Sequence, residues 1–284
     1  MTTHACFKRP GGGKIYEKTY TMMGSGFRYV PQPDTPKSSH LACFGCSFMF
    51  GIGVNDNETL PARLADNWPN AHVYNFAIGS YGPAQPLLQM QSGVLDELEE
   101  GPGAAVFMLM SDHLNRIMPC MSHVLTWAKE FPAFDMDAGG TPRYIGPFSE
   151  IYPGRITLFR ALSNEQFLLW SGMDIPPRPP QYYADLCGAL LGAARDEYRR
   201  RFPQNEFYVL VEPSAYGAAK IPEAIKAIRK RGVPVLDPGR IYRGKKLHYE
   251  REGHPLPEAN QIMADWMCEH FPDGPTGKPV LNGN

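Results

Sequence analysis

The sequence lacks a charge bias, a long apolar run and a leader-like N-terminus, and each absence excludes a class of protein. Lys and Arg number 28 against 29 Asp and Glu, for a formal net charge of -1, so the basic excess of a dedicated nucleic-acid binder is missing. The longest unbroken apolar run, 104–110, is far shorter than the roughly 20 residues that span a bilayer. Residues 1–18 contain no apolar signal segment. We therefore expect no nucleic-acid partner and no membrane span, and a cytoplasmic location by default, or a periplasmic or secreted one if an N-terminal segment was trimmed.

Cysteine is also scarce, with six residues in 284, too few for a disulfide scaffold. Cys43 and Cys46 form a C-x-x-C pair, which keeps a thiol redox protein open as an alternative. A redox site of that kind is followed at once by a regular helix, whereas Gly51 and Gly53 interrupt the chain here. A zinc site needs about four ligands, and no second close cysteine pair exists, so we expect neither a metal nor a cofactor.

Strand-like and helix-like segments alternate along most of the chain. The predicted strands are 40–45, 72–76, 104–110, 206–211 and 233–236, and the predicted helices are 57–68, 84–99, 182–202, 222–230 and 257–271. Because 104–110 is apolar throughout, we expect a mostly parallel sheet covered on both faces. The predicted organisation is an N-terminal extension packed on the domain (1–37) and one α/β domain (38–284). A loop-rich insertion at about 111–180 is expected to hold helices near 116–129 and 164–171.

Four polar or glycine-rich segments follow predicted strands or precede the last helix, where a parallel sheet places its active site. One of them, 111–116, is a polar cluster directly after the third strand. Ser47 lies just beyond the first strand, in FGCSFMFGIG, in the position of a nucleophile or of an ordinary turn residue. The Gly79-Ser80 turn leads to a helix, and its backbone N–H groups suit a developing oxyanion. Glu252-Gly253-His254 has the form of a general base with an acid to orient it.

Together these segments resemble the SGNH (GDSL-like) hydrolase superfamily over roughly residues 38–270. FGCSFMFGIGVNDNETLPARL (44–64) is similar to the nucleophile block, 75–85 to the second block and GHPLPEAN (253–260) to the block with the catalytic histidine. The resemblance implies a flavodoxin-like three-layer α/β/α sandwich and ester hydrolysis or acyl transfer. It also implies that Ser47 is the nucleophile and His254 the base.

Several positions depart from that pattern. Cys46 stands where an aspartate is usual, and Ser80 where glycine is commoner. The third block, usually Gly-x-Asn-Asp, is Ser111-Asp112-His113 here, which puts His113 in the place of the oxyanion-binding asparagine. Asn115 is the fallback donor and Asp112 a further candidate.

The acid of the triad also departs from the family pattern. Its usual position is occupied by Arg251, so Glu252 is the expected acid, with Glu250 a weaker candidate and a Ser–His dyad still open.

The expected function is a serine esterase that removes a small acyl group, such as acetyl, from a carbohydrate or a short-chain ester. An acyl-enzyme on Ser47 is expected, with the oxyanion held by the Ser47 N–H, the Gly79 or Ser80 N–H and the His113 side chain. The expected partner is thus a small-molecule or glycan ester. An O-acyltransferase with the same triad and a catalytically silent glycan-binding protein remain alternatives.

Overall fold

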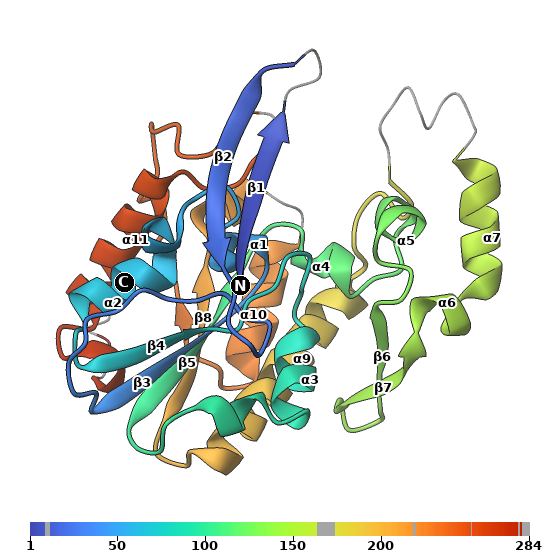
Figure 1. Ribbon diagram of the computed structural model, residues 1–284. Helices are drawn as coiled ribbons and strands as arrows, with labels where there is room; N and C mark the ends of the chain where they lie inside the picture. The colour runs from blue at the N-terminus through green and yellow to red at the C-terminus, as the bar shows by residue number, and fades with distance from the viewer. Residues whose placement is uncertain (9–11, 164–173, 218–219, 251, 278, 280–284) are drawn as a thin grey trace.

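A five-stranded parallel sheet forms the centre of the molecule (Figure 1). The structure is a computed structural model that describes residues 1–8, 12–163, 174–217, 220–250, 252–277 and 279. The strands lie in the order β4-β3-β5-β8-β9, and every neighbouring pair is parallel. The sheet consists of β3 (Ser39–Phe44), β4 (Ala71–Asn75), β5 (Gly103–Leu109), β8 (Glu206–Val211) and β9 (Val235–Leu236). Counted along the sheet strands alone this is the order 2-1-3-4-5, which is the flavodoxin-like order. The predicted fold class is therefore confirmed.

Helices cover both faces of this sheet, as the continuous apolar strand indicates. Side chains of β5 alternate between two hydrophobic clusters: Ala105, Phe107 and Leu109 join one, and Val106 and Met108 the other. The first cluster is covered by α3 (Gln85–Gln91), α9 (Gln181–Arg201) and α10 (Ile221–Lys230), and the second by α2 (Leu60–Asn67) and α11 (Pro257–His270). Two helical layers therefore enclose the sheet.

Local signals explain where two of these helices begin and end. The Thr59 hydroxyl accepts a hydrogen bond of 3.2 Å from the Ala62 N–H and caps α2, after a short 3₁₀ helix at Asp56–Glu58. The helix predicted over 84–99 is shorter in the structure, because Gly93 adopts a φ of +96° after α3. A 3₁₀ helix, Val94–Glu97, follows that break.

The segment from 112 to 162 forms a small unit beside the sheet (Figure 1). It holds α4 (His113–Arg116), α5 (Met121–Thr126), β6 (Pro132–Met136), β7 (Pro142–Pro147), α6 (Phe148–Ile151) and α7 (Pro153–Leu162). Its buried apolar side chains make a separate cluster of Val124, Ala133, Phe148 and Ile156. The helix predicted over 116–129 is shorter in the structure, since α4 ends at Arg116 and only α5 lies within that stretch. The helix predicted at 164–171 lies outside the described residues. The antiparallel pair of β6 and β7 was not predicted.

The N-terminal residues form a hairpin that the sequence analysis did not predict. Strands β1 (Thr2–Lys8) and β2 (Lys14–Thr21) pair antiparallel and project from the body of the molecule (Figure 1). β1 is mostly exposed and β2 is mostly partly buried, and no residue of either strand belongs to the hydrophobic clusters, so the hairpin adds little to the core.

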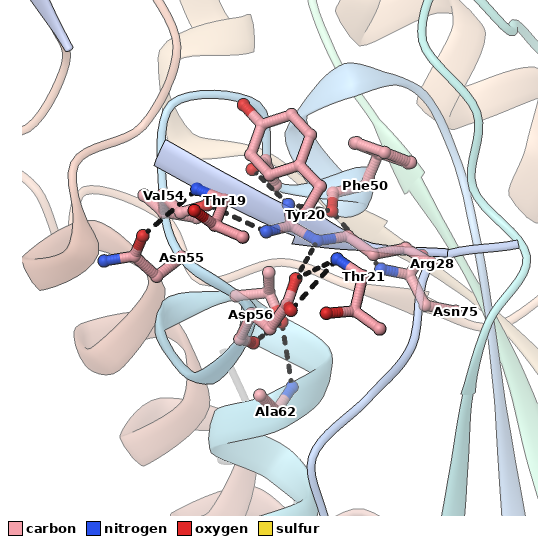
Figure 2. A network of polar contacts seen from close by, with 12 residues as sticks. Thr19, Tyr20, Thr21, Arg28, Phe50, Val54, Asn55, Asp56, Ala62 and Asn75 are labelled. Atoms are coloured by element: carbon pink, nitrogen blue, oxygen red, sulfur yellow. Dashed lines mark hydrogen bonds and ion pairs between the residues drawn. The ribbon is translucent and has the colours of Figure 1, made fainter. Parts of the chain in front are cut away.

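Arg28 joins the segment after the hairpin to the domain (Figure 2). Its side chain is 1% exposed, and its Nε donates to Asp56 Oδ1 at 3.0 Å. Its terminal nitrogens donate to the carbonyl oxygens of Phe50, Gly51 and Val54 at 3.0, 2.5 and 2.8 Å. One guanidinium thereby binds the loop that follows the first strand of the sheet. Among the described residues, no helix is both long and apolar enough to cross a membrane.

Candidate active site

A pocket of about 470 Å³ opens at the carboxyl ends of β3, β4 and β5. Its lining comes from four segments: Ser47, Phe48 and Ile52; Gly79 and Ser80; Met110, Asp112, Arg116, His123 and Trp127; and Glu252, Gly253 and His254. The loops after β3 and β5 lie on either side of the point where the strand order reverses, which is the usual place for a site in such a sheet. The structure thus brings together five of the predicted site residues, Ser47, Gly79, Ser80, Glu252 and His254, as well as the secondary candidate Asp112.

Ser47 is the first residue of α1 (Ser47–Phe50), a single helical turn directly after β3. The turn ends because Gly51 adopts a φ of +90°, and a Cβ at that position would lie 2.5 Å from Thr59 Cγ2. The Ser47 side chain lies at the start of the helix and lines the pocket, with 7% of the residue exposed. A strand, one helical turn and a glycine therefore hold the candidate nucleophile in a fixed position.

His254 lies in a tight loop directly before α11. Its Nδ1 is hydrogen-bonded to Glu252 Oε1, and its backbone N–H donates to Glu252 Oε2 at 3.0 Å. The Nδ1 bond favours the tautomer whose Nε2 carries a free lone pair, which is the form that acts as a general base. The Glu252 side chain is 6% exposed, whereas Glu250 is exposed and Arg251 lies outside the described residues.

Three contacts tie this loop to the nucleophile segment and to its own start. The Tyr249 hydroxyl donates to the Gly53 carbonyl at 2.8 Å, and the ring of Phe48 lies 5.3 Å from the ring of His254. The loop is closed by a 2.8 Å hydrogen bond from the Leu256 N–H to the Leu247 carbonyl. The two loops that carry Ser47 and His254 therefore support each other.

The second-block turn supplies backbone donors at the same pocket. Asn75, the last residue of β4, donates through Nδ2 to the carbonyl oxygens of Met49 and Phe50, both at 3.3 Å, and so connects this turn to α1. Ser80 has a φ of +71°, a left-handed conformation that explains why glycine is the commoner residue there. Within the described part of the chain, neither the Gly79 nor the Ser80 N–H has a hydrogen-bond partner. Both remain free for a ligand.

The predicted role of His113 in the oxyanion hole is not supported by its position. His113 is fully buried and does not line the pocket. Its Nδ1 accepts a 3.3 Å hydrogen bond from the Met110 N–H, and its ring lies 5.2 Å from that of Phe107 in the core. Burial lowers the pKa of His113 well below the usual value. The fallback donor Asn115 also lies outside the pocket lining, since its Nδ2 donates to Asp112 Oδ1 at 3.1 Å.

The third segment instead presents a charged network that the sequence analysis missed. Arg116 Nε donates to Asp112 Oδ2 at 3.1 Å, and His123 Nε2 forms an ion pair with the same oxygen at 3.3 Å. Burial opposes ionisation of both partners, but their mutual contact lowers the pKa of Asp112 to about 2 and raises that of His123 to about 10, with Cys120 also bonded to the histidine. The available signal was the i, i+4 spacing of Asp112 and Arg116, which places both on one side of α4 while His113 faces the core.

The two cysteines of the C-x-x-C pair are both buried and free. Cys43 lies within β3, and the Cys46 thiol donates to Met110 Sδ at 3.0 Å. Burial raises the pKa of both thiols, whereas a reactive cysteine is partly exposed and has a lowered pKa. The redox interpretation of this pair is therefore wrong.

Solved structures similar to this chain are GDSL-family lipolytic proteins and SGNH-hydrolase esterases. A member of the lipolytic G-D-S-L family from Veillonella parvula DSM 2008 shares 9% identity at a TM-score of 0.48, covering 82% of this chain and 98% of that chain. AlinE4, an SGNH-hydrolase family esterase, shares 15% identity at 0.42, covering 83% and 96%. Axe2, an acetylxylan esterase from Geobacillus stearothermophilus, shares 10% identity at 0.46, covering 82% and 94%. The first two of these proteins carry the family names that the sequence motifs resemble. No protein-family model and no curated protein matches the sequence.

Proposed function

We propose that this protein is a serine esterase of the SGNH type that hydrolyses a small acyl ester through an acyl-enzyme on Ser47. The observation that carries this proposal is the convergence of Ser47, the free N–H groups of Gly79 and Ser80, and the Glu252–His254 pair on one pocket. A nucleophile, an oriented base and oxyanion donors are the minimum set for acyl transfer through a serine.

The proposed reaction uses only groups at this pocket. His254 Nε2 takes the proton of Ser47 as its Oγ attacks the ester carbonyl, and Glu252 stabilises the imidazolium that forms. The backbone N–H groups of Ser47 and of Gly79 or Ser80 bind the oxyanion. His254 then protonates the leaving alcohol, and a water activated by the same histidine releases the acyl group.

The pocket volume of about 470 Å³ suits a small acyl group with part of its alcohol, such as an acetylated sugar or a short-chain ester. Trp127, which is 40% exposed at the pocket, offers an aromatic face to a sugar ring. A small-molecule or glycan ester is accordingly the proposed substrate class.

The test is turnover of p-nitrophenyl acetate and butyrate by the wild type, Ser47→Ala and Glu252→Gln. Ser92→Ala, an exposed serine whose hydroxyl bonds only the Gln89 carbonyl, is the matched control. We expect Ser47→Ala to lose all acyl-enzyme turnover, Glu252→Gln to lose most of it and Ser92→Ala to keep it. A fluorophosphonate label should attach to Ser47 in the wild type, and Ser47→Ala should not be labelled.

The same assay separates the alternatives. Acyl transfer to an added sugar alcohol in preference to water would favour an O-acyltransferase. Saccharide binding with neither turnover nor labelling of Ser47 would contradict the esterase and indicate a silent binding protein.

A further inference from the structure

The proposed oxyanion hole lacks the side-chain donor expected from His113, because His113 is buried away from the pocket. Arg116 occupies the junction of the three segments that would surround an oxyanion. Its Nη1 donates to the Tyr81 carbonyl in the second-block turn at 2.7 Å. Its Nη2 lies 3.9 Å from Met110 Sδ, the atom that also accepts the thiol of Cys46 beside Ser47.

The guanidinium is held in this position before any substrate arrives. Asp112 fixes Nε, the Tyr81 carbonyl fixes Nη1, and the ring of Trp127 lies 5.7 Å from Arg116 Cζ. Gly82 makes room for the side chain, since a Cβ there would lie 2.9 Å from Arg116 Cβ. Arg116 is 7% exposed and also lines the pocket, so it is a mostly buried charge in the pocket wall.

The charge on Arg116 is only partly compensated. Asp112 faces both Arg116 and His123, and the pKa values of Asp112 and His123 keep both groups charged near neutral pH. Two positive charges therefore share one negative charge on this wall of the pocket. A surplus positive charge in a buried site stabilises negative charge that develops nearby.

We propose that Arg116 is a catalytic residue that donates a hydrogen bond to the oxyanion formed when Ser47 attacks the ester. When the Ser47 Oγ–carbon bond forms, the carbonyl electron pair moves onto oxygen, and Arg116 Nη2 binds that oxygen together with the backbone N–H groups of the hole. The pair returns when the tetrahedral intermediate collapses, the C–O bond to the alcohol breaks and His254 supplies the proton. Arg116 forms and breaks no covalent bond and keeps all of its protons throughout. This inference rests on the proposed function and supplies the side-chain donor that the third block otherwise lacks.

The test compares Arg116→Met and Arg116→Ala with Arg195→Met. Arg195 is a matched control, because it also pairs with a neighbouring carboxylate, Asp196, and donates to a backbone carbonyl, that of Arg231, but lies on α9 away from the pocket. We expect kcat for p-nitrophenyl acetate to fall by about 100-fold to 1000-fold in both Arg116 variants. KM should stay within about threefold, since an oxyanion donor acts in the transition state. Arg195→Met should keep the wild-type kcat.

Two further readouts separate catalysis from folding. Labelling of Ser47 by a fluorophosphonate also builds charge on oxygen, so its rate should fall in proportion to kcat. Millimolar guanidinium chloride should restore part of the activity of Arg116→Ala and none in Ser47→Ala. If Arg116→Ala loses its circular dichroism signal, the folded Arg116→Met variant carries the test. A folded Arg116 variant that is labelled at the wild-type rate would overturn the proposal.

The outcomes also distinguish this proposal from the function on which it rests. If the wild type neither turns over esters nor accepts the label, the esterase and the role of Arg116 both fall. If wild-type activity depends on Ser47 while Arg116→Met keeps its kcat, only the role of Arg116 is overturned. A loss confined to the KM of p-nitrophenyl hemisuccinate, with acetate unaffected, would make Arg116 a binding group for a substrate carboxylate and would equally refute the oxyanion role.

Discussion

Replacement of Arg28 by methionine is expected to destabilise the whole protein, although Arg28 lies outside the sheet. The change removes the guanidinium that binds Asp56 and the carbonyl oxygens of Phe50, Gly51 and Val54 (Figure 2). Loss of one partner of a buried ion pair costs about 3–5 kcal/mol, because the other charge stays buried. Asp56 keeps two hydrogen bonds from the Thr21 N–H, at 3.2 and 3.0 Å, which moves the expected cost to the lower end, about 3 kcal/mol.

A loss of that size lowers the melting temperature of a domain this large by roughly 5 °C. Urea unfolding followed by circular dichroism gives the free energy, with Arg143→Met as the control. Arg143 is exposed on β7, so its replacement should change stability by less than about 0.5 kcal/mol. Arg28→Lys should fall between the two, since an ammonium retains the charge but not the forked set of donors. A loss below about 1 kcal/mol in Arg28→Met would show that water replaces the guanidinium, and the account of Arg28 as a buried clamp would be refuted.

Two further variants test local features of the site. Ser80→Gly should raise the free energy of unfolding by about 0.5–1 kcal/mol in urea titrations, because Ser80 holds a φ of +71° that glycine adopts freely; a loss of stability would mean that the serine side chain outweighs the backbone cost. His123→Gln should flatten the pH dependence of stability in alkaline solution. The pKa of His123 in the folded protein is raised to about 10, so the pairing with Asp112 contributes fully below the unfolded value near 6.5 and is lost as pH rises toward 10. Urea titrations at pH 6, 8 and 10 should show a decline in the wild type that the variant lacks, and parallel curves for the two proteins would contradict the pairing.

Much of the sheet was predictable, because parallel strands buried on both faces have a strong sequence pattern. The strand 206–211 matches its predicted bounds, and β5 differs from its prediction by one residue at each end. The hairpin of β1 and β2 was missed because β1 is mostly exposed and neither strand shows the regular alternation of a half-buried strand. The break after α3 was missed because the helical pattern continues beyond Gly93, whereas the left-handed glycine ends the hydrogen-bonded turns.

The candidate site likewise has a part that the sequence predicts and a part that it does not. Glu252 and His254 are two residues apart, so their pairing was expected from the sequence, with Glu250 or no acid as alternatives, and the structure has the hydrogen bond between them. The orientation of the side chains on α4 could not be predicted from the sequence. Successive residues of a helix are rotated by about 100°, and this rotation decides whether His113 or its neighbours reach the pocket. Trp127 comes from a segment whose short helices and hairpin have no clear period, so nothing in the sequence placed it beside Ser47.

The pocket walls belong to separately stabilised parts of the chain. Ser47 and His254 are flanked by side chains of the large cluster between the sheet and α11. His123 lies on α5 and Trp127 directly follows it, and α5 packs on the small cluster of Val124, Ala133, Phe148 and Ile156. Substitutions in that small cluster can reshape the opening of the pocket without disturbing the packing beneath the nucleophile. The protein is in this sense modular, and libraries aimed at a new ligand should vary the small cluster and its surroundings within residues 121–162 while sparing His123 and Trp127, which contact Asp112 and Arg116.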